Sequence, residues 1–506
     1  MIDSGQFLIQ AVFTPLVFSI VALITGKYLK KYTGIIVAIS LLYSTILLAI
    51  VMVSLPIAPD AKIEARYKWA PYVGDFTLVA DGISAPIALT IALLSLVVAI
   101  YSIPYMEHEH NLSSYFALYS LYASGMIGTV LTTNLAAFFL FFEFMLIPSW
   151  ALVGIWGTGP KEMIAFKYFM FTEAGALSLL AGIVATYSLA GTFDIFEIAS
   201  RVVGVDLTLI IIIVIAILIG FFVKMAVFPL HTWLPDTHAE APTPISALLS
   251  PAMIGIGGYA AIRIIYYAFP RVLNSWPFTT SLSILALITM VYGGLMAIAQ
   301  DDLKRLLAYS SISQMGYLLF GISSLSFIGI MGSVLLYVSH GLCKAVLFMV
   351  SGIFMHEFKT RRISDLQGLA SKMPYTTIFS LISFLGLAGV PPLLGFWGEL
   401  FIFAGSMYTA LSTSTDFIRA VVTAIAIISA VLTAGYGLWT IRRVFFGEPN
   451  ELVKNAKEAP ALMIIPIGIL AALAVILGVY PTVITEVVSP TLEIILKAIS
   501  CIGCGR

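Results

Sequence analysis

The sequence predicts an all-α membrane protein that crosses the bilayer many times. Hydrophobic residues make up 60% and charged residues 10% of its 506 positions, against roughly 45–50% and roughly 25% in soluble domains. Apolar runs of about 18–25 residues repeat from end to end, which is the length of a helix that spans about 30 Å of hydrocarbon. Proline interrupts two of these runs, and such breaks survive in lipid only inside protein or beside a water-filled cavity.

We expect about fourteen transmembrane helices from these runs. The predicted spans are residues 6–25, 34–56, 84–105, 113–131, 135–156, 163–188, 207–229, 244–268, 279–298, 305–323, 326–354, 374–406, 419–441 and 461–486. The longest polar stretches between them, 57–83, 356–373 and 442–460, are expected to be surface loops.

Two spans are expected to be broken helices. The seventh ends in Lys224-Met-Ala-Val-Phe-Pro229, and the twelfth contains Gly389-Val-Pro-Pro392. Breaks at corresponding places in two halves suggest inverted repeats, here of five helices each, around an ion path. The predicted division is an N-terminal three-helix segment at 1–112, a first repeat at 113–268, a second repeat at 279–441, and a C-terminal helix and tail at 442–506.

The placement of Lys and Arg predicts the orientation in the membrane. Basic residues gather in every second loop, from Lys27 and Lys30 after the first span to Arg442 and Arg443 near the end. Loops rich in Lys and Arg stay in the cytoplasm. We therefore expect a multi-pass protein of the prokaryotic plasma membrane with both termini outside the cytoplasm.

Ionisable residues lie within the apolar runs, where each charge costs at least roughly 2.5–3.5 kcal/mol. Glu143 stands in a run of Phe and Leu, and Lys224 follows the apolar stretch 210–223. The two are natural partners, and movement of the carboxylate's charge would switch the lysine between loaded and unloaded states. A static buried ion pair is the alternative.

The second half carries a matching set of buried titratable residues. His340 and Lys344 share one helix face at a spacing of four residues, which suits a proton relay. Glu399 follows the double-proline break and could exchange protons at the far end of the line. A satisfied histidine with an ion-paired lysine, and a helix-capping glutamate, are the structural alternatives.

Other polar residues give weaker predictions. Lys167 and Glu173 in the sixth span are candidates for the path or for structural pairing. Arg263 is expected to extend to a membrane interface, and Asp81 to cap the third span. The loop pair His108 and His110 and the tail pair Cys501 and Cys504 resemble metal ligands. Each pair lacks the further ligands of a metal site, so we expect neither to bind a metal.

The sequence excludes several function classes. It has 26 basic and 26 acidic residues and no basic tract of the kind that binds nucleic acid. It has no phosphate-binding GxxxxGK[ST] loop and no multi-cysteine cluster for iron–sulfur centres. Energy must therefore come from an ion gradient or from partner subunits.

Several long motifs resemble one family, the antiporter-like subunits of respiratory complex I, of Mrp-type antiporters and of membrane-bound hydrogenases. The motifs are Phe142-Glu-Phe-Met-Leu-Ile-Pro148, Lys224-Met-Ala-Val-Phe-Pro-Leu-His231-Thr-Trp-Leu-Pro-Asp236-Thr-His238, Asp302-Leu-Lys-Arg-Leu-Leu-Ala-Tyr-Ser-Ser310 and Ser339-His-Gly-Leu-Cys-Lys344. The resemblance covers nearly the whole chain and implies fourteen helices in two inverted repeats, with helices seven and twelve broken. Within this family, the sequence is most similar to the M-type subunit of complex I, and it has some features of the Mrp D-type.

The resemblance also implies roles for the buried residues. Glu143 and Lys224 correspond to the family's acid–lysine pair, His340 and Lys344 to its central relay, and Glu399 to its exit residue. The secondary candidates for the proton path are Lys167, Glu173, His231 and His238.

One position departs from the family pattern. Before Gly257-Gly-Tyr259, members of the family have a lysine or histidine that bridges the two halves, and the aligned residue here is Gly255. Water could fill this gap, another side chain could substitute, or the relay could be interrupted.

The resemblance implies a proton-translocating subunit of a complex I-like redox-driven ion pump, either an NADH-quinone oxidoreductase or a hydrogenase- or ferredoxin-linked complex. Such a subunit holds no cofactor, and flavin, iron–sulfur clusters and a quinone or hydrogenase centre are expected on partner subunits. The expected partners are other membrane subunits, including antiporter-like paralogues, and peripheral redox subunits. The alternatives are an Mrp-type Na⁺/H⁺ antiporter subunit and a scaffold that does not pump.

Overall fold

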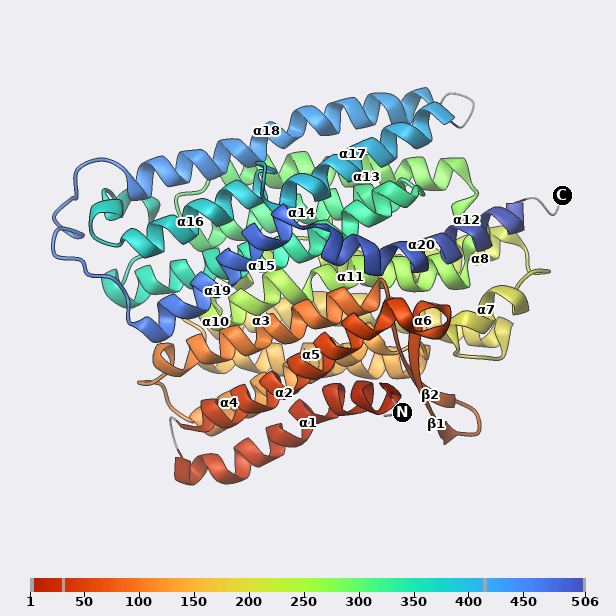
Figure 1. The fold of residues 1–506 in the computed structure, drawn as a ribbon, viewed down its shortest axis with the longest axis horizontal. Coiled ribbons are helices and arrows are strands. Elements are labelled where there is room, and N and C mark those ends of the chain that lie inside the picture. The colour runs from red at the N-terminus through yellow and green to blue at the C-terminus, as the bar shows by residue number, and fades with distance from the viewer. Residues whose placement is uncertain (1–3, 30–31, 413–415, 504–506) are drawn as a thin grey trace.

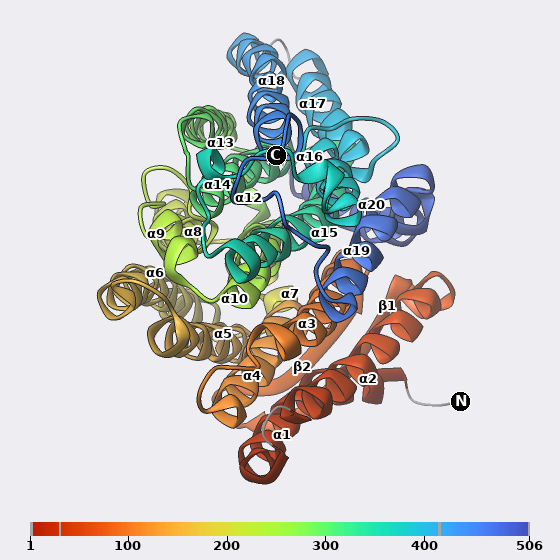
Figure 2. The ribbon, with the colours of Figure 1, turned by 90° about the vertical axis from the view of Figure 1, so that its left-hand side faces the viewer.

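The computed structural model describes residues 4–29, 32–412 and 416–503. Most long helices lie roughly side by side in an elongated bundle, and a view along the bundle shows the first and second halves of the chain on opposite sides of its centre (Figures 1 and 2). The helices of the first half are α1 (Ser4–Leu29), α2 (Thr33–Ser54), α3 (Ser84–Tyr105), α4 (Leu112–Leu131), α5 (Leu135–Trp156), α6 (Lys161–Ala190), α7 (Ile195–Arg201), α8 (Leu207–Met225), α9 (Leu234–Glu240), α10 (Thr243–Leu248), α11 (Gly255–Ala260) and α12 (Pro270–Leu273).

The second half continues the bundle with longer helices. They are α13 (Trp276–Ile298), α14 (Leu303–Ser323), α15 (Phe327–Phe358), α16 (Pro374–Leu387), α17 (Leu394–Ser412), α18 (Phe417–Phe445), α19 (Ala461–Val479) and α20 (Thr482–Gly503).

Helices occupy every predicted span in the part of the chain that the structure describes. Eleven helical segments are long and apolar enough to cross a membrane, and α4, α14 and the α16–α17 pair fill the remaining predicted spans. The chain is therefore a polytopic membrane protein. The total of about fourteen crossings, the inverted repeats and the division at 1–112, 113–268, 279–441 and 442–506 remain predictions.

Two regions differ from the sequence prediction. The stretch 57–83, expected to be a loop, contains an antiparallel hairpin of β1 (Lys62–Ala70) and β2 (Gly74–Asp81). Its first strand buries Ile63 and Ala65 on one face, the alternation that a half-buried strand requires. The last predicted span runs too far, because α19 ends at Val479 before Tyr480-Pro481, and a second helix, α20, follows.

Both predicted helix breaks are present. Helix α8 ends at Met225, Ala226 has a φ of 54°, and the chain runs without a regular helix to α9. Helix α16 ends at Leu387, Gly389 has a φ of 65°, and α17 begins at Leu394. The span at Thr243–Tyr266 is also irregular, which the sequence did not predict, because two π-helical turns, η4 (Leu249–Met253) and η5 (Ala261–Tyr266), flank α11.

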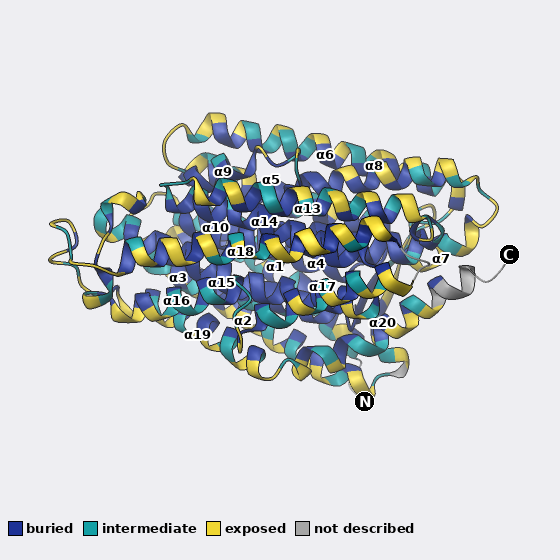
Figure 3. Cartoon of the chain, turned by 90° about the horizontal axis from the view of Figure 1, so that it is seen from above, coloured by how far each residue is buried: buried dark blue, intermediate teal, exposed yellow. Residues whose placement is uncertain are grey.

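The centre of the bundle is made by this irregular segment and by α15. Both are buried along their whole apolar stretch, whereas 33% of the corresponding stretch is buried in α1 and in α18. Exposed residues gather on the outer helices, as Figure 3 shows. Polar side chains in the buried stretch of α15, such as His340 and Lys344, are therefore shielded from the surface of the chain.

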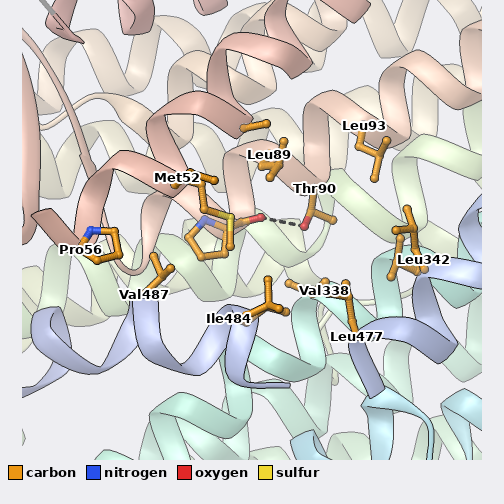
Figure 4. Close-up of a pocket in the computed structure, with 15 residues that line it drawn as sticks. Met52, Pro56, Leu89, Thr90, Leu93, Val338, Leu342, Leu477, Ile484 and Val487 are labelled. Carbon is orange, nitrogen blue, oxygen red and sulfur yellow. Dashed lines mark hydrogen bonds between the residues drawn. The ribbon is translucent and has the colours of Figure 1, made fainter. Parts of the chain in front are cut away.

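An apolar cavity of about 320 Å³ lies between α2, α3, α15, α19 and α20 (Figure 4). Its polar side chain, Thr90, already donates a hydrogen bond to the carbonyl of Pro86 at 2.7 Å. The lining contains no titratable residue. This cavity is therefore not a candidate for ion transfer.

Candidate functional site

The first part of the site is Glu143, in the middle of α5. Asn134 caps this helix by accepting hydrogen bonds from the amides of Ala136 and Ala137. Glu143 is half-buried, and its Oε1 atom is buried without a hydrogen-bond partner among the described residues. Its electrostatic neighbours are Glu173 of α6 and Lys224 of α8.

Lys224 lies one residue before the end of α8 and is 1% exposed. Its Nζ lies 4.7 Å from the centroid of the Phe142 ring and has no hydrogen-bond partner in the described part of the chain. The static hydrogen-bonded pair with Glu143 is therefore absent. The backbone around the break is held instead by Trp233, whose indole nitrogen donates to the carbonyl of Val223 at 3.0 Å.

The secondary candidates of the first half fall in different places. Lys167 pairs with Asp236 at 2.7 Å, and both side chains are at least a quarter exposed. Glu173 lies near Glu143. His231 is 4% exposed, its Nδ1 has no partner among the described residues, and its ring stacks on Phe228 at 5.5 Å.

The central part of the site brings together residues from α9 and α15. His238 is fully buried and stacks on Phe348 at 4.8 Å, and neither ring nitrogen has a partner among the residues described. Lys344 and His340 are its neighbours, and the Nε2 atom of His340 is also unpartnered. Lys344 donates to the carbonyl of Leu307 at 3.0 Å and to the hydroxyl of Ser310.

Sequence reasoning missed Lys304 as a buried residue. The side chain is 1% exposed, and its Nζ donates to the carbonyl of Ala241 at 2.6 Å. It is also an electrostatic neighbour of His238. In the sequence Lys304 stands beside Arg305 in a predicted basic loop, and only its place in the motif beginning at Asp302 marks it.

The far end of the site is Glu399 on α17, which is 8% exposed. Its Oε1 has no partner among the described residues, and its other carboxylate oxygen faces Gly389 in the helix break. Between Lys344 and Glu399 lie two polar groups that sequence reasoning did not select. The Tyr436 hydroxyl, near Ser310 and Gln314, and the Oε1 atom of Gln314 are both buried and unpartnered in the described structure.

Arg263 corrects the sequence prediction. It does not extend to an interface, because it is 1% exposed and its Nη1 lies 2.7 Å from Asp81 Oδ2. Asp81 does cap α3, as predicted, by accepting hydrogen bonds from the amides of Ile83 and Ser84. Burial acts to raise the pKa of Asp81, but the Arg263 guanidinium and the bonds from Ser84 outweigh it and hold that pKa below its ordinary value.

The remaining polar candidates form no metal site in the described residues. His108 and His110 are exposed, and no group of three or more His, Cys, Asp or Glu side chains is placed to hold a metal ion in the part of the chain that the structure covers. The side chain of Cys501 and the residue Cys504 lie outside what the structure describes.

The fold and the site together define a polytopic membrane protein with ionisable side chains buried in its core. Comparison with known proteins agrees. Residues 132–429 match the family described as "NADH:quinone oxidoreductase/Mrp antiporter, TM", and residues 69–116 match "NADH-Ubiquinone oxidoreductase (complex I), chain 5 N-terminus". The chain belongs to this family of complex I and Mrp antiporter membrane subunits.

Individual relatives are similar along most of their length. "NAD(P)H-quinone oxidoreductase chain 4" of Gloeobacter violaceus is 33% identical over 489 residues, covering 95% of this chain and 90% of the relative. "F(420)H(2) dehydrogenase subunit M" of Methanosarcina mazei is 30% identical over 443 residues, covering 86% and 87%. A chain of respiratory complex I from Thermus thermophilus has a TM-score of 0.84 at 25% identity, with 97% and 99% covered.

Proposed function

We propose that this chain translocates protons as one membrane subunit of a complex I-like, redox-driven ion pump. One observation carries the proposal. Titratable side chains lie inside the protein on α5, α8, α9, α15 and α17. Five of them have at least one buried polar atom without a partner in the described structure: Glu143, Lys224, His238, His340 and Glu399. Burying an ionisable group within a membrane costs free energy, and such residues usually mark ion or substrate pathways.

The proposed path runs from Glu143 and Lys224 in the first half to His340, Lys344 and Glu399 in the second. Buried polar groups normally find a protein or water partner. Water between these side chains would supply the missing hydrogen bonds and would carry protons from one group to the next. The unpartnered ring nitrogens of His238 provide a further group beside Lys344 that could accept and release a proton.

The Glu143–Lys224 region is the proposed switch. A nearby carboxylate stabilises the positive charge on a buried lysine, and loss of that negative charge favours release of the proton. No direct hydrogen bond holds the two groups together. A small movement of either one would therefore change the balance between protonated and neutral Lys224. A conformational or charge change from neighbouring subunits could therefore load and unload Lys224.

The energy source is proposed to lie on partner chains. The relatives are named as subunits of a quinone oxidoreductase and of an F(420)H(2) dehydrogenase, so partner subunits would hold the flavin, iron–sulfur and quinone or hydrogenase centres. Antiporter-like paralogues are proposed as membrane neighbours. The basic loops are proposed to face the cytoplasm, with both termini on the other side.

The test uses inverted membrane vesicles that contain the whole complex. NADH, F(420)H(2) and reduced ferredoxin are added singly, and carrier oxidation and internal acidification are recorded together. We expect Lys224→Ala to lower the number of protons moved per carrier oxidised. Lys454→Ala, which removes a lysine exposed on a loop, is the matched control and should leave that ratio unchanged.

Two other outcomes would identify the alternatives. Sodium-driven proton movement without any electron carrier would indicate an Mrp-type antiporter subunit, which the family description includes. An unchanged proton ratio in Lys224→Ala and Glu143→Gln, combined with loss of the complex on deletion of the chain, would indicate a scaffold.

A further inference from the structure

The two halves of the proposed path must be joined at the centre, where Gly255 offers no side chain. A Cβ atom at this position would collide with the ring of Tyr337 from α15. The ring therefore occupies the space beside Gly255 that a longer side chain would need. The Tyr337 hydroxyl donates a 2.9 Å hydrogen bond to the carbonyl of Ala252, in the π-helical turn just before Gly255.

A second tyrosine reaches the same turn from the first half of the chain. The hydroxyl of Tyr168 on α6 lies 3.7 Å from the sulfur of Met253, the residue after Ala252. It also lies 2.7 Å from the hydroxyl of Ser149 on α5. Tyr168 and Tyr337 are thus anchored to adjacent residues of one turn, although they come from opposite halves.

A third tyrosine joins these two. Tyr122 on α4 is fully buried, and its hydroxyl has no hydrogen-bond partner among the described residues. Its electrostatic neighbours are Tyr168 and Tyr337. A buried hydroxyl without a partner is costly unless it binds water, and water beside Tyr122 would connect it to the two neighbouring hydroxyls.

The ends of this cluster meet the proposed proton path on both sides. Tyr168 is an electrostatic neighbour of Glu143. Tyr337 precedes His340 by three residues on α15, so the two side chains lie on one face of that helix.

We propose that Tyr168, Tyr122 and Tyr337 form a hydroxyl bridge that carries protons across the centre in place of a side chain at Gly255. This bridge rests on the proposed proton path and specifies how its two halves are connected.

Each transfer leaves the tyrosines chemically unchanged. Because the Tyr122 hydroxyl has no direct hydrogen bond in the described structure, water links the hydroxyls. Each hydroxyl oxygen accepts a proton from the preceding group or from water, and it releases its own proton to water or finally to His340. The O–H bond that forms replaces the one that breaks, so no phenolate persists and no electrons move. The hydroxyl then rotates back before the next proton arrives.

The test compares tyrosine and phenylalanine at these positions in the assembled complex, with proton movement per carrier oxidised as the readout. Tyr122→Phe and Tyr337→Phe keep the rings that fill the core and remove only the hydroxyls. We expect each to lower the ratio as far as Lys224→Ala does. Tyr119→Phe is the matched control. Like Tyr337, Tyr119 is fully buried and donates to a backbone carbonyl, that of Ser95 at 2.7 Å, but this carbonyl belongs to α3 and not to the turn before Gly255.

Rescue separates a relay from a packing role. Tyr337→His restores a group that can pass a proton, and it should recover the ratio that Tyr337→Phe loses. If Tyr122→Phe and Tyr337→Phe keep the full ratio while Lys224→Ala lowers it, the bridge is wrong and the proposed function stands. If Lys224→Ala also keeps the full ratio, the proposed function itself fails.

Discussion

At the scale of single residues, the buried charges are of two kinds. Arg263 donates to Asp81 and Lys304 to the carbonyl of Ala241, although the Nη2 of Arg263 has no partner among the described residues. The Nζ of Lys224 and the Oε1 of Glu399 are buried without a partner in the described structure. Arg, Lys and Glu are all unusual in an apolar run, but the sequence cannot distinguish the two kinds, because partners such as Asp81 lie far away in the chain.

The Asp81–Arg263 ion pair is predicted to stabilise the fold. Both side chains are nearly inaccessible, so Arg263→Ala leaves a buried carboxylate unpaired, and we expect a loss of about 3–5 kcal/mol of unfolding free energy. Thermal unfolding in detergent measures it. Arg201→Ala removes a pair in which both partners are about half-exposed and should change stability by less than about 1 kcal/mol. Equal effects of the two variants would contradict this assignment.

The same ion pair gives a prediction for pH. The pKa of Asp81 in the folded protein is lower than its ordinary value of 3.8. The ionised form therefore stabilises the fold above that value, and this contribution is lost as pH falls through the lower folded pKa. The stability difference between the wild type and Asp81→Asn should shrink as the pH is lowered below about 4. A difference that is constant down to pH 2 would exclude this linkage.

At the scale of elements, the positions of proline predicted the two helix breaks, but the sequence did not predict the π-helical turns or the β-hairpin. Pro229 and Pro392 predicted the ends of α8 and α16, because proline removes a backbone donor and disfavours a continuing helix. Proline alone does not end a helix here, since Pro148 lies inside α5. The π-helical turns on either side of α11 were missed, although Pro251 lies in the first and Arg263 in the second. The β1–β2 hairpin was missed because charged residues along its exposed face, such as Arg66, hid the alternation of buried Ile63 and Ala65.

Gly389 is predicted to be required in the break between α16 and α17. Alanine there meets a φ of 65° and places its Cβ against the Glu399 carboxylate. Gly389→Ala should therefore lower the proton ratio in vesicles as well as stability. Gly191→Ala is the matched control, because its φ is 67° but nothing lies within 4 Å. It should cost only about 1–2 kcal/mol of backbone strain and leave the ratio intact. A full ratio in Gly389→Ala would show that the position of Glu399 is not critical.

At the scale of the whole molecule, the sequence predicted the class of fold and most of the helices. The start of α1, the end of α20 and the β1–β2 hairpin lie at one end of the bundle, and the loop between α18 and α19 lies at the other (Figure 1). This arrangement fits an even number of crossings. The route across the centre could not be predicted, because Tyr122, Tyr168 and Tyr337 come from three separate helices and tyrosine is common in buried apolar helices.

Labelling of single cysteines is predicted to show the orientation. Tyr72→Cys lies at the exposed tip of the hairpin, where the native side chain is 84% exposed, and Lys454→Cys lies in the opposite loop. In a background with Cys501 and Cys504 replaced by serine, a membrane-impermeant maleimide should label position 72 in intact cells and position 454 only after lysis. The reverse pattern would place both termini in the cytoplasm.

One measurement tests the continuous path most directly: the number of protons moved per carrier oxidised in vesicles carrying Glu143→Gln or Glu399→Gln. These carboxylates lie at opposite ends of the line, and each amide keeps the shape of the side chain but cannot exchange a proton. The proposed path predicts that both variants lower the ratio to the same extent, with the complex still assembled. A normal ratio in either variant would contradict a single path through both halves.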